Sequence, residues 1–119
     1  MSYVSGFLLA VPEANKAAYK AMAEKAWPLF KEYGCLSIQE NWGVDTPDGK
    51  VTSFPMAVKR EEGEVVVFSW MIWPDKATAD KGFERMMTDP RMKEMTEMPF
   101  DGMRMMWGGF EPLVTLTAD

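Results

Sequence analysis

The sequence predicts an α+β fold with the ferredoxin-like split βαβ arrangement, in which two strand-helix-strand units form one four-stranded sheet. Two observations favour this fold. Stretches rich in β-branched and aromatic residues alternate with stretches whose apolar residues recur at helical spacing, in the order strand, helix, strand, repeated once. The length of 119 residues is also typical of one domain. We therefore expect a single domain over residues 1–119.

The first unit begins with a strand and a long helix. Residues 3–11 are β-branched, aromatic or small and are followed by Pro12, which is typical of a strand that ends there. Over residues 15–34 the apolar side chains recur every three or four positions, which predicts an amphipathic helix. Gly34 suits its C-terminal cap, and Pro28 predicts a kink or a break.

A second strand and an irregular segment complete the first half. Residues 35–42 alternate in polarity, with one face formed by Leu36, Ile38, Glu40 and Trp42. Residues 43–50 have the composition of a turn. Residues 51–58 fit no single element, and Pro55 argues against a central strand there.

The second unit repeats the same order. Residues 64–73 are apolar on both faces, which predicts a strand buried on both sides. A helix then begins at Asp75 or Thr78 and ends before Pro90, and a helical turn follows over 91–95. A last strand is expected over 103–107, interrupted by two glycines and followed by an extended tail over 110–116.

This topology leaves one apolar face of the sheet without a cover. The first and third strands are central, the second and fourth lie at the edges, and two helices cover only one face. An exposed apolar face is unfavourable in water, so we expect a second copy of the chain to cover it as a homodimer.

Charge and composition exclude several classes of function. The chain has a net charge of −5, which disfavours nucleic-acid binding. It contains no histidine, the commonest general base and transition-metal ligand, so we expect no tightly bound metal, haem or other cofactor. Cys35 is the single cysteine, which fits a reducing cytoplasm, and no stretch is long enough to anchor the chain in a membrane.

Three acidic or basic residues are candidates for chemistry. Glu40 falls on the apolar face of its strand, where desolvation would raise its pKa toward that of a useful general acid or base. The alternative is an edge carboxylate paired with a lysine or arginine. Asp101 and Arg104 form a second candidate pair, which either binds a ligand or braces a turn.

Aromatic and methionine residues are the candidates for ligand binding. Trp42, Trp70, Trp73 and Trp107 fall on or beside three different strands and could share one wall of a cavity. Met105 belongs to a group of methionines crowded into the last third of the chain, which could line an adaptable pocket. Filling of the core and of a subunit contact is the alternative for both kinds of residue.

Five segments carry a resemblance to a known family. The chain resembles the YbaA-like family of small bacterial proteins, a domain of unknown function, nearly from end to end. The segments are YVSGFLLAVP (3–12), ENWG (40–43), PDGKV (47–51), FSWMIWPDK (68–76) and MPFDGMRMMWGGFE (98–111). The resemblance implies the dimeric α+β barrel superfamily, which includes cofactor-independent monooxygenases, muconolactone isomerase-like enzymes and heme-handling proteins.

The chain departs from that family pattern at five positions. The family commonly has acidic residues at the places of Ser5, Val44 and Ser53, and basic residues at those of Pro55 and Met56. A charged site of the relatives would therefore be altered here. Some relatives carry a name linked to signal recognition particle RNA, against which the negative net charge argues.

Two hypotheses of function remain open at this point. The first, which rests on fold analogy, is binding or cofactor-free transformation of a small apolar molecule, aromatic or quinone-like, in a cleft between sheet and helices. The second is a non-catalytic dimeric module with a stress or regulatory role. An open cleft lined by Trp, Met and one desolvated carboxylate would favour the first hypothesis, and a filled interior would favour the second.

Overall fold

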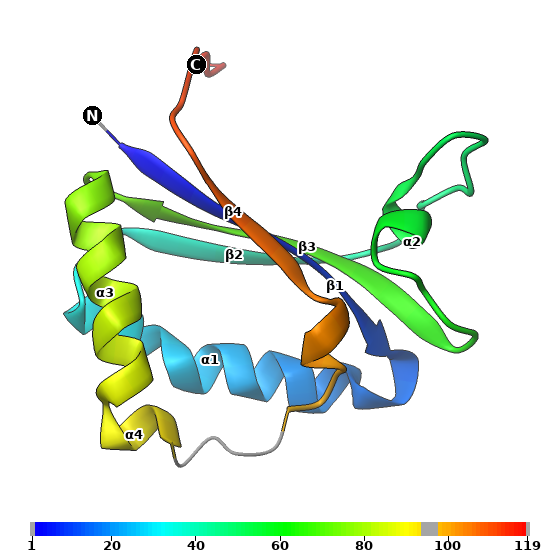
Figure 1. Ribbon diagram of the computed structural model, residues 1–119, viewed down its shortest axis with the longest axis horizontal. Helices are drawn as coiled ribbons and strands as arrows, with labels where there is room; N and C mark the ends of the chain where they lie inside the picture. Colours follow the sequence, from blue (N-terminus) through cyan, green and yellow to red (C-terminus); the bar gives the residue numbers. More distant parts are fainter. Residues whose placement is uncertain (1, 94–97, 119) are drawn as a thin grey trace.

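The strands form one antiparallel sheet. The computed structural model describes residues 2–93 and 98–118 and contains β1 (Tyr3–Pro12), β2 (Ser37–Trp42), β3 (Glu64–Trp73) and β4 (Met106–Phe110). The strand order is β2-β3-β1-β4, and every neighbouring pair is antiparallel (Figure 1). The first and third strands are therefore central, as predicted for the ferredoxin-like arrangement.

Two long helices cover one face of this sheet. They are α1 (Lys16–Glu32) and α3 (Lys76–Thr88), which lie on the same side of the strands in Figure 1. The shorter elements are η1 (Glu13–Asn15), α2 (Phe54–Ala57), α4 (Pro90–Lys93) and η2 (Gly102–Arg104). The helical turn expected over 91–95 is α4, although its expected last residues lie outside the described part of the chain. No helix of the described residues is long and apolar enough to span a membrane.

Local sequence signals explain the helix ends. Gly34 has a φ of 105°, the left-handed conformation that favours glycine after a helix. The Asp75 carboxylate accepts a hydrogen bond of 2.7 Å from the backbone N–H of Thr78 and caps α3. Of the kink or break expected at Pro28, the break does not occur, because α1 continues through that residue to Glu32. Packing of the α1 face on the sheet outweighs the single hydrogen bond that proline removes.

The last strand differs from its prediction. Residues 102–104 form η2, and β4 contains both glycines instead of being interrupted by them. Gly109 lies opposite Ser5, and a Cβ at this position would lie 1.6 Å from the Tyr3 hydroxyl. Glycine therefore belongs in this strand, because any side chain would collide with Tyr3.

The main core lies between the sheet and the helices. Trp73 is fully buried at its centre, and its ring contacts those of Phe30 and Phe83. The core continues along the strand residues that share the helix-facing side with Trp73. A smaller cluster of Ala10, Val58 and Val66 packs on the other side of the sheet.

Much of that other side is open. Phe68, Met106 and Phe110 are each between 46% and 59% exposed there, and the strand register places Trp70 on the same face. In the single chain, the apolar sheet face opposite the two long helices is therefore largely uncovered, as the sequence predicted.

Candidate functional site

A tyrosine, a glutamate and a serine form the polar centre of the helix-facing side. The Tyr19 hydroxyl of α1 donates a hydrogen bond of 2.7 Å to Oε1 of Glu40 on β2. Ser69 lies directly opposite Glu40 on β3 and is buried. Tyr19 is also buried, so a buried hydroxyl of α1 holds the carboxylate, beside the buried Ser69 of β3.

The environment shifts the pKa values of both ionisable groups upward. Desolvation raises the pKa of Glu40 and outweighs the hydrogen bonds from Tyr19 and Ser69, which lower it. Burial, together with the neighbouring Glu40 charge, raises the pKa of Tyr19, so its hydroxyl stays protonated and donates. Glu40 belongs to an edge strand and is exposed as a residue, although the side chains around its carboxyl group desolvate it enough to raise its pKa.

An apolar cavity opens beside this polar centre. Its volume is about 380 Å³, and it lies between the sheet, α1 and α3. Most of its lining is aromatic or methionine: Phe7, Tyr19, Phe30, Phe83, Phe100, Met22, Met71, Met86, Met92, Met98 and Met105. Glu40 is the one charged residue in the described lining of this inner cavity.

A larger groove lies on the other side of the carboxylate. This outer groove, of about 750 Å³, runs between α1 and β2 and shares Tyr19, Ala23, Ile38 and Glu40 with the inner cavity. Trp42 also lines it, with Nζ of Lys16 5.2 Å from the centroid of its ring. Glu40 therefore stands at the boundary between the inner cavity and the outer groove.

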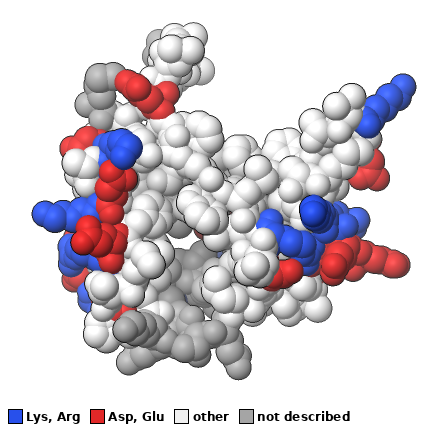
Figure 2. Space-filling view, viewed as in Figure 1, with Lys and Arg blue, Asp and Glu red and all other residues white. Residues whose placement is uncertain are grey.

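A third hollow extends the inner cavity toward β4. It has a volume of about 450 Å³ and is lined by Trp107, Ser5 and Met105 among others. Met105 borders both spaces, so they adjoin. Figure 2 shows a hollow near the centre of this face, between α3 and η2, with charged side chains gathered mainly at the flanks.

The structure separates the four tryptophans that were grouped from the sequence, of which Trp73 is fully buried in the core. Trp42 lines the outer groove, Trp107 lines the third hollow, and Trp70 faces the opposite side of the sheet. The expectation that they share one wall is wrong, because strand alternation and register put them on different faces and opposite edges. Met105 lies in the inner cavity, as proposed for a ligand contact.

Sequence reasoning missed two members of the polar centre. Tyr19 was assigned only to the apolar side of its helix, and Ser69 only to a buried strand. Each residue is a weak signal by itself, since a tyrosine or serine in a core stretch has many structural explanations. Alternation within β3 puts Ser69 on the same face as Met71, but only the register across β2 and β3 places it beside Glu40.

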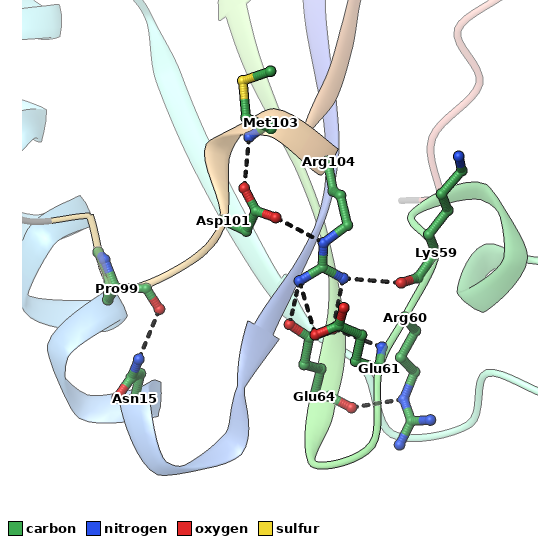
Figure 3. Close-up of polar contacts among 9 residues, drawn as sticks. All are labelled: Asn15, Lys59, Arg60, Glu61, Glu64, Pro99, Asp101, Met103 and Arg104. Carbon is green, nitrogen blue, oxygen red and sulfur yellow. Dashed lines mark hydrogen bonds and ion pairs between the residues drawn. The ribbon is translucent and has the colours of Figure 1, made fainter.

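The second candidate pair, Asp101 and Arg104, braces the chain. Arg104 lies on η2 instead of the last strand, and its Nε donates to the Asp101 carboxylate at 3.0 Å. Its remaining nitrogens contact both Oε atoms of Glu64, at 2.8 and 2.6 Å, and the carbonyl oxygen of Lys59, at 2.9 Å (Figure 3). The guanidinium thereby ties η2 to the start of β3, and neither Asp101 nor Arg104 lines the inner cavity as described.

Glu64 is the buried end of that brace. It is 7% exposed, and the hydrogen bonds from Arg104 hold its pKa below the usual range despite desolvation. Within the ranges 2–93 and 98–118, no group of three or more cysteine, aspartate or glutamate residues is arranged to hold a metal ion.

Comparison with known proteins identifies the family. The sequence pattern of the family described as "Protein of unknown function (DUF1428)" matches residues 2–102. The chain belongs to this family. It is similar to the uncharacterized protein YbaA of Escherichia coli K12 and of Shigella flexneri, with 59% identity over 115 residues, which cover 96% of this chain and 98% of YbaA.

A solved structure shows the same fold at low identity. It is described as a dimeric ferredoxin-like protein from an uncultured marine organism. The TM-score is 0.55 and the identity 12%, and the match covers 98% of each chain. The ferredoxin-like fold of this DUF1428 member is thereby confirmed.

The positions that depart from the family pattern lie mostly away from the polar centre. Ser5 is buried and accepts a hydrogen bond of 3.1 Å from the Trp73 indole. Ser53 caps α2 by accepting from the backbone N–H of Met56, and Pro55 is buried in its first turn. Val44 is exposed in the preceding loop. Only Ser5 borders one of the three spaces on the helix side.

Proposed function

We propose that this protein binds a small apolar molecule in the inner cavity, with Glu40 as its polar contact. The observation that carries the proposal is an apolar cavity of about 380 Å³ with a single carboxylate in its described lining. Protein interiors are normally close-packed, and an empty apolar cavity costs stability. Methionine side chains adapt to ligands of different shape, which suits such a lining.

The polar centre gives Glu40 a chemical role within this proposal. Its carboxylate is the group that contacts a polar atom of the bound molecule and exchanges a proton with it. Tyr19 and Ser69 hold the carboxylate in place. The open interior supports this ligand-binding hypothesis over the alternative of a non-catalytic module with a filled core.

Filling the cavity is expected to block binding. Ala23 lines both the inner cavity and the outer groove, whereas Ala17 is exposed on α1. We expect N-phenyl-1-naphthylamine, a neutral apolar dye, to gain fluorescence with the native protein and with Ala17→Phe. Ala23→Phe is expected to lower that gain at least about tenfold, because a phenyl group takes up the space of the dye.

Circular dichroism on both variants checks that they remain folded. Equal dye binding by folded Ala23→Phe and Ala17→Phe would contradict a site in this cavity. No binding by the native protein would contradict it as well.

We also propose that two copies pair through the open face of the sheet. Phe68, Met106 and Phe110 are exposed there beside the half-buried Trp70, and covering such an apolar surface is favourable by roughly 25 cal/mol per Å². The dimeric state given for the marine ferredoxin-like protein supports a second copy as the occupant.

The dimer is expected to have twice the 13.5 kDa mass of the chain in light scattering after size exclusion. Phe68→Glu is expected to yield monomers, because it would bury a charge in the contact. Met87→Glu, on α3 away from the open face of the sheet, serves as the matched control, since Met87 is also exposed. A monomeric native protein at micromolar concentration would overturn the proposal.

A further inference from the structure

We infer that the molecule bound in the inner cavity is an organic cation: a small apolar or aromatic amine whose ammonium group binds the Glu40 carboxylate. This inference rests on the proposed function and narrows its ligand class. Three features support it: the charge of Glu40, the hydrogen bonding of its carboxylate and the residues that line the cavity.

The Glu40 carboxylate has no countercharge among the described residues. Glu40 forms no ion pair with a lysine or arginine of the described chain, and its neighbours Tyr19 and Ser69 are neutral hydroxyls. The Glu64 carboxylate of the same protein has such a partner, because two nitrogens of Arg104 bind its two oxygens. A carboxylate that borders an apolar cavity gains most from a partner of opposite charge, and this site leaves that place to a ligand.

Aromatic rings and methionines form most of the walls of the inner cavity. Phe7, Phe30, Phe83 and Phe100 line it, and the Phe100 ring packs edge-on against Tyr19, with 5.7 Å between ring centroids. The faces of aromatic rings attract cations, and the attraction grows when water is excluded. Methionine sulfurs add polarizable surface without adding charge. Such walls accept both the apolar body of an amine and the region around its charged nitrogen.

The two lysines near Glu40 lie outside the inner cavity. Lys16 and Lys20 line the outer groove, on the other side of Glu40, together with Glu24. Lys16 lies over the ring of Trp42, and neither lysine lines the inner cavity. An ammonium group on the inner side of Glu40 therefore meets a carboxylate and aromatic rings. The net charge of −5 further favours the approach of cations.

A matched pair of ligands tests the inference. Benzylamine and benzyl alcohol have nearly the same size and shape, but benzylamine is positively charged at neutral pH. We expect isothermal titration calorimetry to show benzylamine binding at least about tenfold more tightly, as a charge-assisted hydrogen bond predicts. Glu40→Gln, which keeps the shape of the side chain, is expected to abolish this preference.

Glu24→Gln is the control, because it removes a carboxylate from the outer groove only, and we expect it to keep the preference for benzylamine. Equal affinity of the native protein for the two ligands, or an unchanged preference in Glu40→Gln, would overturn the cation inference. In that case the apolar cavity would remain the binding site. If the native protein bound neither ligand nor the neutral dye, both proposals would be wrong.

Discussion

Replacing Trp73 by alanine is expected to lower the free energy of unfolding by about 3–5 kcal/mol, the usual cost of removing a large aromatic side chain from a core. Trp73 has no exposed surface, and its indole contacts Phe30 of α1 and Phe83 of α3. Gly82 leaves room for it, since a Cβ on that glycine would lie 2.7 Å from the indole ring. The change would therefore open a cavity where both long helices meet the sheet.

Urea unfolding followed by tryptophan fluorescence and circular dichroism measures this effect. Trp107→Ala is the matched control, because Trp107 is 73% exposed on an edge strand. Its effect is expected to stay within about 1 kcal/mol, as for most surface substitutions. Similar losses in the two variants would show that Trp73 is not the centre of the core.

Replacing Arg104 by methionine is expected to lower the midpoint of thermal unfolding by about 10 °C, since small domains lose several degrees per kcal/mol. Methionine keeps much of the length of the side chain but leaves the Glu64 carboxylate buried without a cation. The same change removes the link from η2 to the carbonyl oxygen of Lys59. Differential scanning calorimetry at neutral pH provides the measurement.

Asp101→Asn is the control for this brace, because it weakens one exposed contact of Arg104 and keeps the pair with Glu64. We expect a shift of only a few degrees in this variant. A native-like midpoint for Arg104→Met would show that the pair contributes nothing to stability.

The same pair predicts a dependence of stability on pH. The pKa of Glu64 is lower in the folded protein than its ordinary value of 4.5, so the ion pair stabilises the protein above that value. This stabilisation is lost as the pH falls through the folded pKa. We expect the difference in unfolding free energy between the native protein and Arg104→Met to shrink between neutral pH and about pH 3. A constant difference would contradict the assignment.

Several elements were predictable because their signals are local. The apolar run that forms β3, the alternation in β2 and the helical spacing in α1 each depend on neighbours a few residues away. Together with the order of elements, they were enough to predict the ferredoxin-like topology and its two central strands. The C-terminal cap at Gly34 was predictable for the same reason, since it needs only a residue that tolerates a positive φ.

Other features were mispredicted because they depend on partners far along the chain. The two glycines of β4 resemble an interruption until Gly109 is placed against Tyr3. Arg104 was expected in the last strand, either binding a ligand or bracing a turn, but Glu64, forty residues away, determines its position. Trp70 was wrongly grouped with the tryptophans of a cavity wall, because the register with neighbouring strands decides which face a strand residue occupies.

The sequence by itself determined the fold, the family and one residue of the candidate site. Glu40 could be singled out because strand alternation put a carboxylate among apolar neighbours. Tertiary structure alone decided what surrounds that carboxylate: the hydroxyl of Tyr19 from α1, Ser69 from β3 and methionines from several elements. Local patterns arise from interactions between near neighbours, whereas a cavity arises where distant segments pack without filling the space between them.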